Sequence, residues 1–115
     1  MLPVLKYNGI EIARTVELSR TILSQAFGLM FRKSIPSDYS MIFILEKPSS
    51  VGIHMLFVFF PIDVIFLDEE KKIKGLSSLK PWLGFKTMKS VKYVIEMKAG
   101  TIEMFNLSAG GQMEF

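Results

Sequence analysis

The fold is decided by residues 53–67, which read IHMLFVFFPIDVIFL. A membrane-spanning helix needs about 20 mostly apolar residues. This stretch is shorter and contains His54, Pro61 and Asp63, so no contact with a membrane is expected. Its Phe, Val and Ile side chains favour buried β-strands, and Pro61 divides it because proline has no N–H to donate to a sheet. The two expected strands are Ile53–Phe59 and Ile62–Leu67.

Strand-like runs continue on both sides of this stretch, and one segment has the period of a helix. Asn8 and Gly9 tolerate the positive φ angles of a type I′ turn, which predicts a hairpin. An apolar stripe behind Thr21, ending at Gly28, predicts a short helix near residues 22–27. The other expected strands are Val4–Tyr7, Ile10–Leu18, Met41–Leu45, Ile73–Leu79, Val91–Met97 and Gln112–Phe115, and Thr101–Phe105 is either a helical turn or extended.

About eight strands and one helix indicate a mainly β fold, with α+β at the margin. We expect residues 1–115 to form a single domain, a compact antiparallel β-sandwich or barrel. The chain has no cysteine and one histidine. Disulfides and thiolate sites are therefore excluded, and a metal site would depend on carboxylates around His54. No secretory signal pattern is present at Met1–Gly9, so a cytoplasmic location is expected.

Several blocks of the sequence resemble the uncharacterised family known as domain of unknown function 192, or uncharacterised protein family 127. The matching blocks, in order, are Gly28–Arg32, Met41–Phe43, His54–Met55, Phe60–Asp68, Val94–Gly100, and Gly111 with Phe115. The resemblance implies a compact, jelly-roll-like β fold and no particular activity. This chain departs from the family pattern at Phe59 and Gln112, so any site that uses those positions is in doubt.

Asp63 is the first candidate site residue, because an unpaired carboxylate inside an apolar strand would be costly. Arg32 is its expected partner, since a guanidinium satisfies both carboxylate oxygens. The favoured interpretation is that this pair braces the loop after the helix against the sheet. The functional alternative is a shallow ligand-binding pocket in which Arg32 binds an anion, Asp63 orients it and His54 lies nearby. His54 alone is more often a packing residue than a base or ligand.

Lysines and aromatic residues alternate in the C-terminal part of the chain. Lys86, Lys89 and Lys92 are candidate nucleic-acid contacts, because charge with aromatics suits a phosphate backbone and stacked bases. The favoured interpretation is a solvated lysine face with the aromatic residues anchoring a loop on the core, because the net charge is only +3. Binding to nucleic acid is therefore not expected.

The sequence favours a non-enzymatic binding or accessory domain for a small polar or anionic ligand, or for a protein partner. One alternative is a metal-independent hydrolase that uses carboxylates, with Glu46 or Glu96 approaching Asp63 through the fold. The other is nucleic-acid binding through the lysine-rich part. No catalytic residue, metal ligand or cofactor is assigned, and the chain is expected to be a monomer or a small homo-oligomer.

Overall fold

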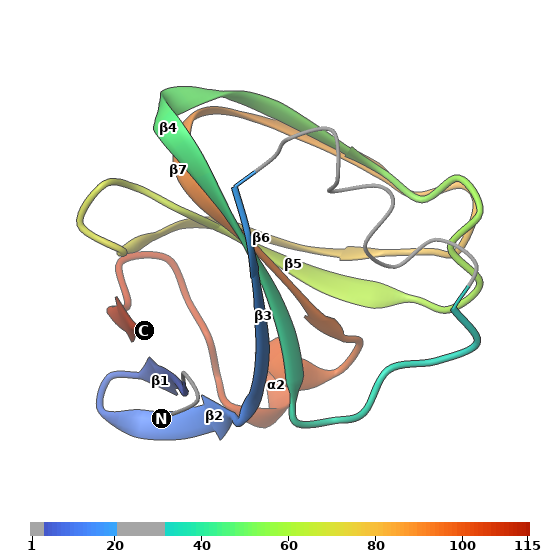
Figure 1. The fold of residues 1–115 in the computed structure, drawn as a ribbon, viewed down its shortest axis with the longest axis horizontal. Helices are drawn as coiled ribbons and strands as arrows, with labels where there is room; N and C mark the ends of the chain where they lie inside the picture. The colour runs from blue at the N-terminus through green and yellow to red at the C-terminus, as the bar shows by residue number, and fades with distance from the viewer. Residues whose placement is uncertain (1–3, 21–31) are drawn as a thin grey trace.

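The computed structural model describes residues 4–20 and 32–115, and its strands form two sheets (Figure 1). One sheet has the order β3-β4-β7-β5-β6 and the other β2-β1-β8. The elements are β1 (Leu5–Tyr7), β2 (Ile10–Ala13), β3 (Thr15–Ser19), β4 (Tyr39–His54), β5 (Ile62–Leu67), β6 (Ile73–Leu79), β7 (Phe85–Lys98), α2 (Thr101–Met104) and β8 (Met113–Glu114). The predicted mainly β, sandwich-like fold is confirmed, and these strands do not close into a barrel. The helix predicted at residues 22–27 lies outside the described residues.

The N-terminal hairpin forms at the predicted turn. Asn8 and Gly9 have φ angles of 48° and 84°, as a type I′ turn requires. The long strand expected after the turn is divided at Arg14, because β2 and β3 belong to different sheets. The amides of Arg14 and Thr15 both donate to the carbonyl of Asp38, at 3.0 and 3.1 Å. This contact turns the chain into β3, which pairs parallel with β4.

The strands β4 and β7 are long and bent, and they connect the two halves of the larger sheet. Their pairing register shifts on both sides of Ser49. The ammonium group of Lys92 donates to the carbonyls of Leu45 and Glu46 beside this shift, so backbone groups that leave the ladder are satisfied. Two predicted boundaries were wrong here. Residues 46–50 continue β4 rather than ending it, and the strand expected from Ile53 to Phe59 ends at His54.

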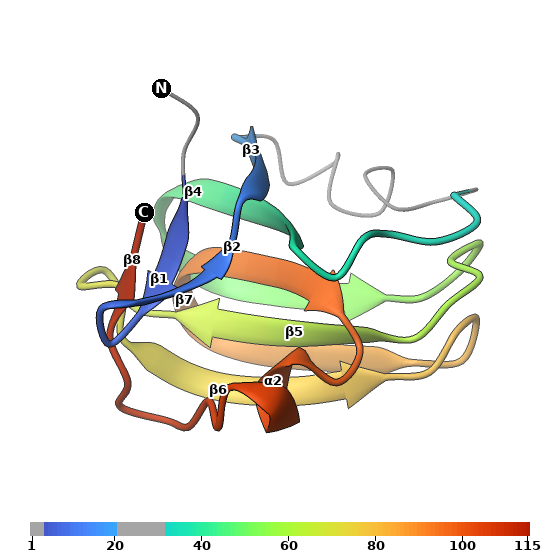
Figure 2. The ribbon, with the colours of Figure 1, turned by 90° about the horizontal axis from the view of Figure 1, so that it is seen from below.

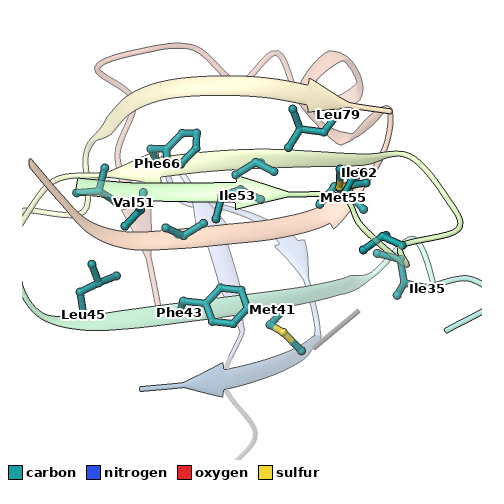
Figure 3. Close-up of a cluster of buried hydrophobic side chains, with 14 of the residues drawn as sticks. Ile35, Met41, Phe43, Leu45, Val51, Ile53, Met55, Ile62, Phe66 and Leu79 are labelled. Carbon is teal, nitrogen blue, oxygen red and sulfur yellow. The ribbon is translucent and has the colours of Figure 1, made fainter. Parts of the chain in front are cut away.

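Side chains alternate along the strands, so the larger sheet carries a hydrophobic cluster on each face. The first cluster includes Phe43 from the first half of β4, Ile53 from its second half and Phe66 of β5 (Figure 3). The second cluster lies between the two sheets and includes Ile65 of β5 and Leu5 of β1. Both clusters are almost completely buried.

Two loops lie together at one end of the molecule, on the right of both ribbon views (Figures 1 and 2). They are residues 55–61, between β4 and β5, and residues 80–84, between β6 and β7. Within the described ranges, no helix has the length and apolarity needed to span a bilayer.

Candidate functional site

Asp63 is buried, and its carboxylate is fully used within the fold. The residue is 1% exposed. Its Oδ1 accepts the hydroxyl of Ser78 at 2.7 Å, and its Oδ2 accepts the amides of Gly100 and Ile102 at 3.1 and 2.9 Å. These amides belong to the N-cap residue and to the first turn of α2, where N–H groups have no partner within the helix. Asp63 of β5 therefore caps α2.

The predicted pair of Arg32 and Asp63 is wrong. The Arg32 guanidinium instead lies 3.4 Å from the carboxylate of Glu17 and 5.3 Å from the ring centroid of Tyr39. Tyr39 belongs to the first hydrophobic cluster. Asp63 points to the other face of the sheet, because it shares that face with its β7 register partner Met97 in the second cluster. Local backbone amides satisfy the carboxylate, so an arginine is not needed.

His54 lies at the end of β4, opposite Phe85 of β7. Its Nδ1 atom is buried and has no hydrogen-bond partner among the residues that the structure describes. No hydrogen bond or ion pair of the described chain joins any two of Arg32, His54 and Asp63. Their role in ligand binding stays a prediction, without a shared polar network to support it.

Glu96 is a second buried carboxyl group, which the sequence offered only as a possible neighbour of Asp63 in the hydrolase alternative. It is 2% exposed in β7, between its register partners Met41 and Val64. Burial raises its pKa from the ordinary value of 4.5 to about 8, because an apolar environment penalises the charged form. Glu96 is thus mostly protonated at neutral pH.

The two buried carboxyl groups point to opposite faces of the larger sheet. Asp63 is the register partner of Met97, and the next residue, Val64, is the partner of Glu96. Since alternate residues of a strand face opposite ways, Asp63 and Glu96 do not share a pocket. The carboxylate pair that the hydrolase alternative requires is therefore not formed by these residues. Glu46 is exposed, at the bend of β4.

The candidate nucleic-acid lysines differ in their surroundings. Lys92 is held by the backbone carbonyls at the bend of β4, as described above. Lys89 is exposed, and its own carbonyl accepts the ammonium of Lys74 at 2.8 Å. Lys86 is half-buried, opposite Ile53. Lys92 thus has a structural role, and nucleic-acid binding by Lys86 and Lys89 stays the less favoured alternative that the sequence left open.

One cavity bounded by described residues lies near the family blocks, and it is small. A cavity of about 150 Å³ lies among Ser34, Ile35, Phe60, Pro61, Lys98 and Ala99. Sites for small ligands usually measure about 300–1,000 Å³, so this cavity has room for one apolar group rather than for a whole substrate. Within residues 4–20 and 32–115, no three His, Cys, Asp or Glu side chains are grouped as a metal site would need.

Large hydrophobic side chains are exposed on the two loops described above and at the start of β7. We call this set the aromatic end. Leu83 is 86% exposed and Phe85 64% exposed, and Trp82 has 44% of its surface in solvent. The members of the set are Leu56, Phe57, Phe59, Trp82, Leu83 and Phe85. The expectation that aromatic residues anchor this loop on the core was therefore wrong.

Backbone contacts fix the aromatic end. The amide of Trp82 donates to the carbonyl of Met55 at 3.1 Å, and the amide of Met55 donates to the carbonyl of Gly84 at 3.0 Å. Phe57 and Trp82 both have positive φ angles, 61° and 65°, which cost a residue other than glycine about 1–3 kcal/mol. Their rings meet edge to face, with centroids 5.0 Å apart. The loops thus hold aromatic side chains outward in a strained conformation.

Tight packing explains why the second loop cannot relax inward. A Cβ atom at Gly84 would lie 2.8 Å from the Cβ of Leu79, the carbonyl of Lys80 and the Cγ of Met55. Only glycine therefore fits between the two loops. The sequence signal for this end was the run of aromatic residues around Pro61 and Pro81. The run before Pro61 was misread as a buried strand, because composition does not show which side chains face solvent, whereas the segment around Pro81 was expected to be a loop.

Comparison with known proteins identifies a family. The model of DUF192, described as Uncharacterized ACR, matches residues 4–115. A UPF0127 protein of Pyrococcus furiosus is 36% identical over 100% of this chain and 97% of its own length. A UPF0127 protein of Pyrococcus abyssi is 35% identical over 87% of this chain and 85% of its own length.

Two solved structures share the fold. A proposed transcription regulator of Sinorhizobium meliloti has a TM-score of 0.79 and 26% identity, over 86% of this chain and 79% of its own. A protein of unknown function from Novosphingobium aromaticivorans has a TM-score of 0.85 and 23% identity, over 97% of this chain and 84% of its own. The second likeness concerns the fold alone.

Proposed function

The chain belongs to the DUF192 family, as its sequence blocks predicted, and because that family is described as uncharacterised we propose a function from the geometry. We propose that the chain is a non-enzymatic binding domain and that the aromatic end is its binding face. The observation that carries the proposal is the group of six large hydrophobic side chains exposed at one end. Contiguous exposed apolar groups of this kind usually mark interaction sites, whereas single ones need no explanation.

The strain in the loops supports this proposal. If stability alone determined the loop conformation, the side chains of Trp82 and Phe57 would be buried, because burying an aromatic side chain stabilises the folded state by about 1.5–3 kcal/mol. Here both residues adopt positive φ angles and stay exposed. Such strain persists mainly where surrounding contacts impose it, and it concentrates at functional sites.

The polar groups give less support to an enzyme. Asp63 caps α2, and Glu96 lies in an apolar core on the opposite face of the sheet. Arg32 pairs with Glu17 at the surface. In the part of the chain that the structure describes, these groups do not converge on a common space where a reacting atom could sit.

A photo-crosslinking amino acid in place of Leu83 tests this binding face in living cells. The position tolerates the change because the Leu83 side chain is 86% exposed. The matched control is Met104 of α2, an apolar residue that is 72% exposed away from the two loops. We expect protein or lipid adducts from position 83 well above those from position 104, and weaker adducts when Phe85 is also changed to Ser. Equal yields from positions 83 and 104 would overturn the proposal.

A further inference from the structure

We propose that the occupant of the aromatic end is a membrane surface that contains anionic lipids, an inference that rests on the binding face proposed above. The aromatic end projects from loops, as insertion into a membrane interface requires, and it includes Trp82 with Leu83 at its most exposed point. Tryptophan suits the level of lipid headgroups, because its ring is largely apolar and its N–H remains able to donate a hydrogen bond.

The charge around the aromatic end selects an anionic surface. The loop 55–61 has no charged residue, and the loop 80–84 has no acidic residue. Lys80 and Lys86 flank the loop that carries Trp82 and Leu83. Lysine stems lie along apolar surface while their ammonium groups reach anionic headgroups.

Asp63, which follows the loop 55–61, does not oppose this positive charge at the surface. It is 1% exposed, and its carboxylate accepts hydrogen bonds from Ser78 and from two amides of α2. The positive charge of the flanking lysines therefore reaches solvent without an exposed acidic neighbour in either loop.

The same charge disfavours a second copy of the chain as the occupant. Two copies that met through their aromatic ends would bring Lys80 and Lys86 of one copy close to the same lysines of the other. Like charges at an interface oppose association. The expectation of no membrane contact considered a spanning helix, and it does not apply to loops that dip into the headgroup layer.

Trp82 is the only tryptophan of the chain, so its fluorescence reports docking directly. The full chain is titrated with vesicles of phosphatidylcholine alone and with vesicles of phosphatidylcholine and phosphatidylglycerol in equal parts. We expect a blue shift with the anionic vesicles, quenching by lipids brominated on their acyl chains, and weakening by salt. Neutral vesicles should produce a much smaller change.

Variants separate the apolar and the charged contributions. Leu83→Ser should weaken binding about tenfold, by roughly the burial of one leucine side chain, whereas Met104→Ser should not change it. Lys80→Gln with Lys86→Gln should remove most of the preference for anionic vesicles. Lys47→Gln with Lys89→Gln alters net charge equally near the bend of β4, and it should preserve that preference. Thermal unfolding of each variant, followed by circular dichroism, checks that it is folded.

The outcomes distinguish this inference from the proposed function. An absent blue shift with both kinds of vesicle overturns the inference, and equal binding to both kinds overturns its anionic part. Protein adducts from position 83 without lipid adducts keep the binding face but replace the membrane by a protein. If sedimentation shows a dimer that Leu83→Ser dissociates, the occupant is a second copy and the inference is overturned.

Discussion

Replacing Glu96 by Gln should change how the stability of the fold depends on pH. Glu96 is 2% exposed, and burial raises its pKa to about 8. Below pH 4.5 the carboxyl group is mostly protonated in both the folded and the unfolded state, so it does not make the free energy of unfolding depend on pH. Between pH 4.5 and 8 the unfolded state releases the proton and the folded state retains it, so stability falls as pH rises.

The size of this effect follows from the difference between the two pKa values. At about 1.4 kcal/mol per pH unit, the fall reaches about 3 kcal/mol at pH 7 and levels off near 5 kcal/mol above pH 8. A buried glutamine does not ionise, so Glu96→Gln lacks this loss. Any cost of its unpaired amide is the same at every pH, and the change with pH is therefore the quantity to compare.

Guanidinium unfolding of both proteins at about pH 5, 7 and 9, followed by circular dichroism, measures the effect. The free energy of unfolding of Glu96→Gln should rise relative to the unaltered protein between the lowest and the highest pH. Glu114→Gln, which removes an exposed carboxylate of β8, should leave the pH profile nearly unchanged. Parallel profiles for Glu96→Gln and the unaltered protein would refute the reasoning.

Three further substitutions test the structural roles of single residues. Asp63→Ala should lower the free energy of unfolding by about 2–4 kcal/mol, because it removes three hydrogen bonds and leaves two amides of α2 without an acceptor; a change within experimental error in denaturant unfolding would contradict the capping role. Gly84→Ala should cost about 1–3 kcal/mol through overcrowding against Met55, and it should lower the melting temperature more than Gly52→Ala, where an added Cβ has only ordinary contacts of 3.7–3.8 Å. Arg32→Ala should lower the free energy of unfolding by less than about 1 kcal/mol, since the ion pair of Arg32 with Glu17 is partly exposed. A much larger loss, measured by calorimetry, would contradict this weak contribution.

The parts of the fold set by short-range chemistry could be predicted from the sequence. Asn8 and Gly9 adopt the two positive φ angles of the hairpin turn, which these two residue types tolerate by their own backbone preferences. The bend of β4 could not be predicted in the same way. At this bend the carbonyls of Leu45 and Glu46 accept hydrogen bonds from Lys92, which lies 47 and 46 residues later in the chain. No local sequence pattern indicates so distant a contact.

The candidate site was predicted in part, for a related reason. The sequence correctly required partners for Asp63, because a lone buried carboxylate is costly. The sequence indicated Arg32 as the partner because charged side chains can be read from a sequence, whereas backbone amides without a partner cannot. The donors at Gly100 and Ile102 exist only once the first turn of α2 has formed. Exposure of Leu83 and Phe85 likewise depends on loop geometry, which an apolar pattern does not report.

The cap on α2 has a consequence for the order of folding. Four residues are far too few for a helix to persist alone in water, and α2 receives its acceptor from Asp63 of β5, nearly 40 residues earlier in the chain. The helix therefore becomes stable only after β5 has taken its place in the sheet, so it belongs to the late events of folding. In kinetic terms, loss of this carboxylate should speed unfolding and leave the refolding rate nearly unchanged.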